Sequence, residues 1–277
     1  MEKLNISFIG AGNMASSLIG GILADSKTPV NIHVADTNPE QLSALQQRFA
    51  VTICQSNNAA TKAADILVLA VKPQGLKQVA EEIRDSVQSK QPLVISIAAG
   101  IQEKDISRWL GNDVAIVRTM PNTPSLIQTG ATGLYANDKV TEDQRNIAET
   151  IMRAVGLAVW VENEQQMDVV TAISGSGPAY YFLFMEAMQA AGQELGLDAE
   201  TARLLTLQTA FGATKMALES SEDCTNLRQR VTSPGGTTEQ ALLTFEQGQL
   251  RQLIKQAVTA ATKRSQELAQ LLGEDHS

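Results

Sequence analysis

The first fifteen residues constrain the fold more than any other segment of the chain. Ile6-Ser7-Phe8-Ile9 is a short apolar run of the kind found in buried strands. A G-x-G-x-x-A turn (Gly10, Gly12, Ala15) follows and opens into helical sequence. In that context Gly10 permits a tight turn, Gly12 lets the backbone approach a pyrophosphate, and Ala15 allows close helix–strand packing. The segment predicts a dinucleotide-binding βαβ unit, and the alternative is a glycine turn that binds nothing.

The first 160 residues alternate short β-branched runs with amphipathic stretches, which predicts βαβ units and a doubly wound parallel sheet. The strands contain little polar alternation, as expected where both faces of a sheet are covered. We expect strands at 5–9, 30–34, 51–54, 66–71, 93–97, 114–118, 130–135 and 157–161, and helices at 13–24, 39–49, 76–88, 103–109 and 142–155.

The composition changes after Glu162, because Leu, Ala, Met, Gln and Glu, which favour helices, then dominate. We therefore expect a Rossmann NAD(P)-binding domain over 1–162 and an all-α dimerisation and substrate-binding domain over 163–277. Its helices are predicted at 166–173, 178–195, 199–218, 226–231, 238–247 and 250–272.

The predicted helix 179–195 is apolar on more than one face and so needs cover on all sides. Small helical domains often lack enough surface to bury by themselves. We therefore expect at least a homodimer, with a higher homo-oligomer left open, and the alternative is a self-contained bundle.

Charge and composition exclude several classes of partner. The formal net charge is -8, and without a basic stripe we expect no nucleic-acid or membrane partner. Neither a signal peptide nor a membrane-length apolar run is visible, so we expect a cytoplasmic protein with a small-molecule substrate. Two distant cysteines, Cys54 and Cys224, predict buried free thiols and no disulfide. No cluster has the spacing of metal ligands, so we expect no metal.

Three other segments belong to the predicted nucleotide site. Asp36 closes the second strand, where a carboxylate accepts hydrogen bonds from an adenosine ribose and repels a 2′-phosphate. By itself it favours NADH, although Thr37 beside it offers a hydroxyl, and the same residues also suit a helix start capped by Thr37 or Asn38. Lys72, at the end of the fourth strand, faces either the cofactor or solvent. The small residues 96–100 would let the backbone approach a nicotinamide ring.

Several blocks of the sequence resemble the pyrroline-5-carboxylate reductase family, in the family's order and over residues 4 to 270. The glycine turn is shared with many dehydrogenases, whereas M-P-N-T-P (120–124), S-G-S-G-P-A-Y (174–180) and S-P-G-G-T-T (233–238) are specific. Two further blocks agree with the family, A-V-K-P-Q (70–74) and S-I-A-A-G (96–100).

This resemblance implies the last step of proline synthesis, the reduction of 1-pyrroline-5-carboxylate, with NADP(H) as the usual cofactor and NAD(H) as the alternative that Asp36 suggests. It also implies a substrate site between the cofactor and the helical domain. With the motif above, it places the cofactor at Ile9, Gly10, Ala11, Gly12, Asn13, Met14, Asp36, Thr37, Asn57, Ala70, Val71, Lys72, Pro73, Ile97, Ala98 and Ala99.

The substrate is a cyclic imine that carries a carboxylate, so the chain must hold an anion and serve the ring nitrogen. Two glycines before a helix start expose several N–H groups to one anion, which predicts a substrate site at Gly235, Gly236, Thr237 and Thr238. The alternative is an ordinary capped helix start with a Pro-Gly turn. The Thr238 hydroxyl can both donate and accept, so we predict that it is the catalytic residue. Met120 and Asn122, on a proline-stiffened loop, are predicted to line the pocket, and the alternative is a rigid interdomain connector.

One segment departs from the family. Where the family often has a Glu near the substrate, ungapped alignment places Ser221, with Glu222 adjacent. No role is carried over to either residue.

Two other functions remain open from the sequence. β-Hydroxyacid dehydrogenases share this architecture but need a helical Lys with an Asn four residues later, whereas Lys215 is followed by Glu219. An NAD(P)-sensing regulator would bind the nucleotide without turnover.

Overall fold

The computed structural model describes residues 3–24 and 29–273. The chain divides into two compact units, which are Met1–Ser176 together with Ala260–Ser277, and Gly177–Thr259. The last helix therefore contributes to both units. The functional boundary drawn from composition, after residue 162, stays a prediction.

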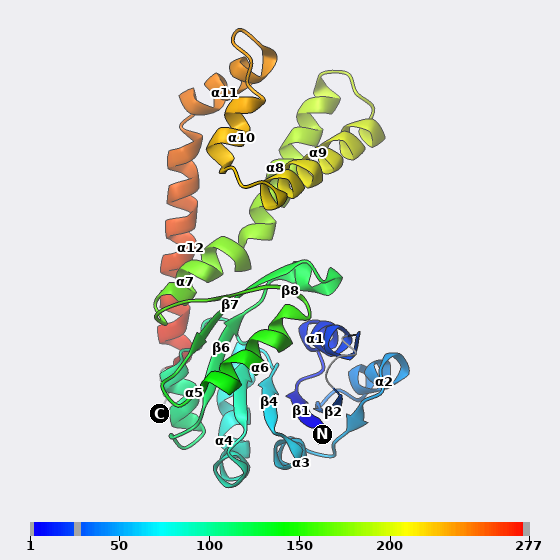
Figure 1. The fold of residues 1–277 in the computed structure, drawn as a ribbon, viewed down its shortest axis with the longest axis vertical. Coiled ribbons are helices and arrows are strands. Elements are labelled where there is room, and N and C mark those ends of the chain that lie inside the picture. The colour runs from blue at the N-terminus through cyan, green and yellow to red at the C-terminus, as the bar shows by residue number, and fades with distance from the viewer. Residues whose placement is uncertain (1–2, 25–28, 274–277) are drawn as a thin grey trace. The chain divides into compact units, whose positions relative to one another are not determined.

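The larger unit is built on one eight-stranded sheet with the strand order β3-β2-β1-β4-β5-β6-β7-β8 (Figure 1). Neighbouring strands are parallel except for β7, which runs antiparallel to β6. The first six strands have the order of the Rossmann fold, so the predicted fold class is confirmed. The strands are β1 Leu4–Ile9, β2 Val30–Ala35, β3 Thr52–Ile53, β4 Ile66–Leu69, β5 Leu93–Ser96, β6 Ile116–Met120, β7 Gly130–Ala136 and β8 Gly156–Trp160.

Helices cover both faces of this sheet. On one face, α1 and α6 bury aliphatic side chains such as Leu18 and Ile151 against β1 and β4. On the other face, α4 and α5 bury Ile83 and Trp109, and Leu272 near the end of α12 packs against the same core. The helices of this unit are α1 Asn13–Ala24, α2 Pro39–Arg48, α3 Asn57–Ala63, α4 Pro73–Lys90, α5 Glu103–Trp109, α6 Glu142–Arg153 and α7 Gln166–Val170, with a 3₁₀ turn η1 at Thr123–Ile127 and a π turn η2 at Thr171–Gly175.

The smaller unit is helical. α8 packs against α9, and the ring of Phe184 on α8 lies 6.2 Å from that of Phe245 on α11. Large apolar side chains stay exposed on these helices, among them Tyr181, Phe182 and Phe211. The helices are α8 Gly177–Glu194, α9 Ala199–Glu219, α10 Cys224–Arg230, α11 Thr237–Gln247 and the first part of α12 Leu250–Gly273.

Three local predictions need correction. The helix α3 was missed, because its seven residues carry too short an apolar pattern to separate helix from loop. The M-P-N-T-P loop continues into the 3₁₀ turn η1. The helix predicted over 166–173 ends at Val170 and continues as the π turn η2, where Gly175 packs closely against the Met120 side chain.

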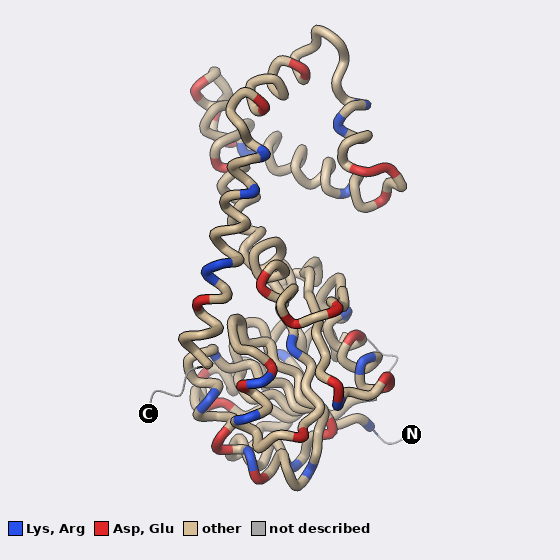
Figure 2. Tube along the Cα trace, turned by 90° about the vertical axis from the view of Figure 1, so that its left-hand side faces the viewer, with Lys and Arg blue, Asp and Glu red and all other residues tan. Residues whose placement is uncertain are grey.

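Surface features agree with the acidic composition. Acidic and basic residues are interspersed along the chain, and the described residues show no continuous run of basic positions (Figure 2). Within the described ranges, no helix has the length and apolarity needed to cross a bilayer. Both cysteines are free thiols, but the prediction that both are buried is wrong, because Cys54 is half-buried and Cys224 is exposed on α10.

Candidate active site

The glycine turn between β1 and α1 is held tightly against the sheet. Gly10 has a φ of 104°, a conformation that side chains rarely adopt. A Cβ atom on Gly10 would lie 2.5 Å from the carbonyl oxygen of Ala70, at the end of β4. The Gly10 N–H donates to Ala35 O at 2.8 Å. The turn thus needs glycine at this position because the neighbouring strand leaves no room for a side chain.

Gly12 has the opposite surroundings. A Cβ atom on Gly12 would meet nothing within 4 Å, so the backbone faces open space. Helix α1 begins at Asn13, and the first N–H groups of a helix have no partner within it. An open approach to unpaired N–H groups at a helix start suits a pyrophosphate. The residues of this turn therefore fit a dinucleotide.

Asp36 links the glycine turn to the end of β2. Its Oδ2 accepts from the Ala11 N–H at 2.6 Å, and its Oδ1 accepts from the Asn38 N–H at 2.7 Å. The Asn38 side chain caps α2 by accepting from the N–H groups of Glu40 and Gln41, so the predicted helix start is present with Asn38 as its cap. The contact of Asp36 with a ribose stays a prediction. A carboxylate has about four acceptor sites, which leaves Asp36 able to accept from a ribose as well.

Replacing Asp36 with serine is expected to raise the preference for NADPH over NADH. The reason is the loss of a negative charge beside the position of a 2′-phosphate, a change of about 1–2 kcal/mol or roughly 5- to 30-fold. The measurement is the ratio of the two kcat/KM values. The control is Asp36→Asn, which removes the charge but keeps a side-chain oxygen that can accept from the Ala11 N–H. It therefore separates the loss of the charge from the loss of this hydrogen bond. An unchanged ratio in both variants would mean that Asp36 serves only the turn and α2.

The other predicted cofactor residues lie at the carboxyl ends of the strands or beside them. Lys72 is exposed at the N-cap of α4, and Pro73 is the first residue of that helix. Ala98 is buried in the core, with Ile97 and Ala99 half-buried beside it. Asn57 opens α3, and its side chain donates to Glu82 Oε2 at 2.9 Å. Their contacts with the cofactor stay predictions, as do those of Ile9, Asn13, Met14, Thr37, Ala70 and Val71.

Asn122 ties three segments together after β6. Its Nδ2 donates to Ser174 O at 3.0 Å in the π turn, and its Oδ1 accepts from the Ala131 N–H at 2.9 Å in β7. Met120 lies half-buried against Gly175 of the same π turn. Because both ends of the Asn122 amide are engaged, this side chain positions the loop. Direct contact of Met120 and Asn122 with the substrate stays a prediction.

A charged pair joins buried Arg118 to half-buried Glu164. Arg118 on β6 is buried and donates to Glu164 Oε1 at 3.0 Å, and the same oxygen accepts from the Glu103 N–H. Burial raises the pKa of Glu103, with repulsion from Glu164 and Asp138 adding to it, against a hydrogen bond from Asn137. Neither composition nor motif indicated this cluster, since its members are far apart in the sequence.

In the helical unit, the S-P-G-G-T-T segment forms a turn into α11. Gly235 has a φ of 71°, Gly236 is the N-cap of the helix, and Thr238 is half-buried in its first turn. The Gly235 N–H donates to Glu239 Oε2 at 2.7 Å, and the Gly236 N–H donates to Ser233 O at 3.0 Å.

Sequence reasoning missed Glu239, although an acidic residue in the first turn of a helix is a recognisable capping signal. Its carboxylate already occupies one of the N–H groups that we predicted for the substrate. The Gly236 N–H is engaged as well, by Ser233 O. For the predicted anion site this leaves the N–H groups of Thr237 and Thr238, which belong to the first turn and have no partner within the helix.

One of the two side chains at the departure from the family pattern has a charged partner. Glu222 Oε1 pairs with Arg230 Nη1 at 2.6 Å, whereas Ser221 is exposed. Lys215 pairs with Glu219 at 3.8 Å along α9, where a hydroxyacid dehydrogenase would need an Asn.

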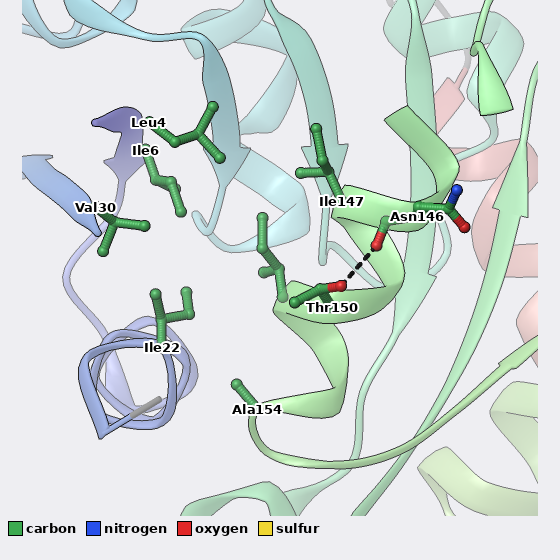
Figure 3. Close-up of a pocket in the computed structure, with 9 residues that line it drawn as sticks. Leu4, Ile6, Ile22, Val30, Asn146, Ile147, Thr150 and Ala154 are labelled. Atoms are coloured by element: carbon green, nitrogen blue, oxygen red, sulfur yellow. Dashed lines mark hydrogen bonds between the residues drawn. The ribbon is translucent and has the colours of Figure 1, made fainter. Parts of the chain in front are cut away.

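An aliphatic cavity of about 200 Å³ lies elsewhere on the larger unit, lined by Leu4, Ile22, Val30 and Ala154 among others (Figure 3). Leu4 and Val30 are the first residues of β1 and β2, whereas nucleotides bind at the carboxyl ends of parallel strands. This cavity is thus not part of the cofactor site. Among the described residues, no group of three or more His, Cys, Asp or Glu side chains is arranged to hold a metal ion.

Comparison with known proteins matches both halves of the chain. Residues 164–268 match the family described as pyrroline-5-carboxylate reductase dimerisation, and residues 5–100 match NADP oxidoreductase, coenzyme F420-dependent. The pyrroline-5-carboxylate reductase of Pseudomonas aeruginosa is 48% identical over 99% of this chain and 100% of its own length. Pyrroline-5-carboxylate reductase 2 of Bacillus subtilis is 38% identical over 95% of this chain and 94% of its own.

Solved structures agree over the full length. A pyrroline-5-carboxylate reductase from Coxiella burnetii has a TM-score of 0.92 at 49% identity and covers 97% of this chain and 99% of its own. The Plasmodium falciparum enzyme, solved with NADP bound, has a TM-score of 0.83 at 30% identity, with the same coverage. A 3-hydroxyisobutyrate dehydrogenase shares only the fold, at 13% identity and a TM-score of 0.52.

Proposed function

Because the chain belongs to the pyrroline-5-carboxylate reductase family, we propose that it performs this family's reaction with the two glycine-rich turns described above. It reduces 1-pyrroline-5-carboxylate to L-proline with NAD(P)H as the reductant, the last step of proline biosynthesis. The rival readings lose support, since Lys215 has Glu219 in place of the required Asn and the close relatives are reductases.

The proposed reaction requires little acid–base catalysis from the residues of the chain. When bound, NAD(P)H supplies the hydride that adds to the imine carbon. If the substrate binds as the protonated iminium, the carbon is already electrophilic and the nitrogen already carries its proton. The chain must then hold the substrate in one orientation and stabilise the nitrogen, a positioning effect of several kcal/mol.

Each glycine-rich turn has one task in this proposal. Gly12 and the start of α1 hold the pyrophosphate, and the strand ends at Ala70–Pro73 and Ile97–Ala99 line the rest of the cofactor. The N–H groups of Thr237 and Thr238 at the start of α11 hold the substrate carboxylate. The Thr238 hydroxyl accepts from or donates to the ring nitrogen, and it is the catalytic residue that we propose.

The observation that carries the proposal is that this chain has two helix starts suited to an anion. One is the open backbone at Gly12 in the larger unit, and the other is the start of α11 after Gly236 in the smaller unit. The test is the consumption of NADPH, followed by its absorbance, on addition of 1-pyrroline-5-carboxylate, with proline identified as the product. A hydroxyacid with NAD(P) is the control for a dehydrogenase. Nucleotide binding without turnover on the imine would support a sensor instead.

The proposal also covers the oligomeric state of the protein and its location in the cell. The chain forms a homo-oligomer through its dimerisation region, and we propose that the smallest active form is a homodimer. The exposed apolar side chains of α8 and α9 support this, since they need cover. We further propose that the protein works in the cytoplasm on a small-molecule substrate, without nucleic acid or membrane.

A further inference from the structure

The side-chain amide of Asn57 is held at one end by a carboxylate from another helix. Asn57 is the first residue of α3, and its Nδ2 donates to Glu82 Oε2 of α4 at 2.9 Å. The following residue is fastened to the same part of α4, because Asn58 Nδ2 donates to Glu82 O at 3.2 Å and Asn58 Oδ1 accepts from Ser86 Oγ at 2.6 Å. Together these hydrogen bonds fix the start of α3 on α4.

The start of α3 lies at the same end of the sheet as the glycine turn. The Ser7 hydroxyl on β1 donates to Ala60 O at 2.7 Å in the buried interior. Because α3 leads from the carboxyl end of β3 to the start of β4, it runs opposite to the strands, and Asn57 lies one turn beyond Ala60 toward Gly10. Asp36 follows β2, the parallel neighbour of β3, at this same edge. Asn57 and Asp36 thus both border the carboxyl ends of the strands, where nucleotides bind in such sheets.

Glu82 decides which end of the Asn57 amide is left for a ligand. A carboxylate accepts hydrogen bonds and donates none, so the amide must turn its nitrogen toward Glu82. The oxygen is then the other end of the amide, and within the described ranges no N–H or O–H group donates to Asn57 Oδ1. The Asn57 side chain is half-buried, so part of it stays open to a bound molecule. The end of the amide that remains for that molecule is therefore a hydrogen-bond acceptor.

The two nicotinamide nucleotides differ at the adenosine ribose, where NADH has a 2′-hydroxyl that can donate to an amide oxygen and NADPH has a 2′-phosphate that accepts. We propose that Glu82 is a positioning residue for cofactor choice: by holding the nitrogen of Asn57, it turns the amide oxygen toward the ribose and so favours NADH over NADPH. To donate to a 2′-phosphate, the amide would have to turn over, lose its bond to Glu82 and point its oxygen at that carboxylate. This inference rests on the proposed function, because it requires the ribose of NAD(P)H at this end of the sheet.

The first test compares two neighbouring glutamates of α4. In Glu82→Gln the new amide can donate or accept, so the Asn57 amide is free to turn over. The ratio of kcat/KM with NADPH to kcat/KM with NADH should rise about three- to tenfold, the effect of one hydrogen bond. The matched control is Glu81→Gln, which removes the same charge from the preceding exposed residue and keeps the bond between Asn57 and Glu82. An unchanged ratio in Glu82→Gln, or an equal rise in both variants, would overturn the proposal.

A double-mutant cycle tests whether Glu82 acts through Asn57. Asn57→Ala has no amide to orient, so on that background Glu82→Gln should change the NADPH-to-NADH ratio by less than about 1.5-fold. An equal effect on both backgrounds would overturn the proposal, because Glu82 would then act by its charge alone. Dissociation constants of the two nucleotides, titrated without the imine, should shift in the same direction as the kinetic ratio. Such a shift in a chain that does not reduce the imine would support this inference and contradict the proposed function.

Discussion

Gly10→Ala is expected to cost the protein both stability and cofactor binding. The new Cβ would lie 2.5 Å from Ala70 O, and the φ of 104° is strained for any residue with a side chain. Backbone strain and overpacking together should lower the free energy of unfolding by about 2–5 kcal/mol. Because β1 and β4 are neighbours at the centre of the sheet, the turn can yield only by moving away from β4. Thermal unfolding and NADPH titration measure the two effects.

Gly12→Ala provides the matched control, since both substitutions add one methyl group to the same turn. Nothing lies within 4 Å of the added Cβ, so the midpoint of thermal unfolding should stay near wild type. The methyl group would occupy the approach of the pyrophosphate, and the dissociation constant for NADPH should rise roughly 10- to 100-fold, as when a hydrogen bond to a charged group is lost. If Gly12→Ala binds NADPH like wild type, the pyrophosphate does not use this turn.

Thr238→Ala is expected to lower kcat/KM for the imine by roughly ten- to a few-hundredfold. The substitution removes one hydroxyl beside the proposed carboxylate site and leaves the N–H groups of the α11 start in place. Losing a hydrogen bond to a charged group costs about 1.5–3 kcal/mol, which gives that range. Steady-state kinetics with saturating NADPH measure the effect. The dissociation constant for NADPH should stay within about twofold, because every proposed cofactor residue belongs to the sheet unit.

Two variants separate chemistry from structure at this position. Thr238→Ser should recover most of the activity, since it restores the hydroxyl and lacks only a methyl group. Thr237→Ala, at the exposed neighbouring residue, removes a hydroxyl from the same helix start and should retain near wild-type kcat/KM. Wild-type kcat/KM in Thr238→Ala would assign the nitrogen to water or to another residue. A strong loss of NADPH affinity would instead mean that the segment holds the two units together.

Much of the sheet unit could be predicted from local pattern. The β-branched runs, the glycine turn and the amphipathic stretches between them indicated all eight strands and most helices, because each pattern reports burial along a few neighbouring residues. Short elements were harder to predict from the sequence. α3 has seven residues and η1 has five, so neither shows enough periods to be recognised.

The site residues also fall into two groups, those that local sequence predicted and those that it did not. The sequence by itself determined where the two glycine turns lie and that a helix begins after each, because both features depend on residue type and on close neighbours in the chain. Only the tertiary structure decided that Gly10 is fixed by Ala70 O, that Asp36 braces Ala11, and that Asn122 joins Ser174 to β7. The pair of Arg118 and Glu164 likewise joins segments that are distant in the chain. The physical reason is that propensity and periodicity act between near neighbours, whereas strand register and packing decide which distant atoms meet.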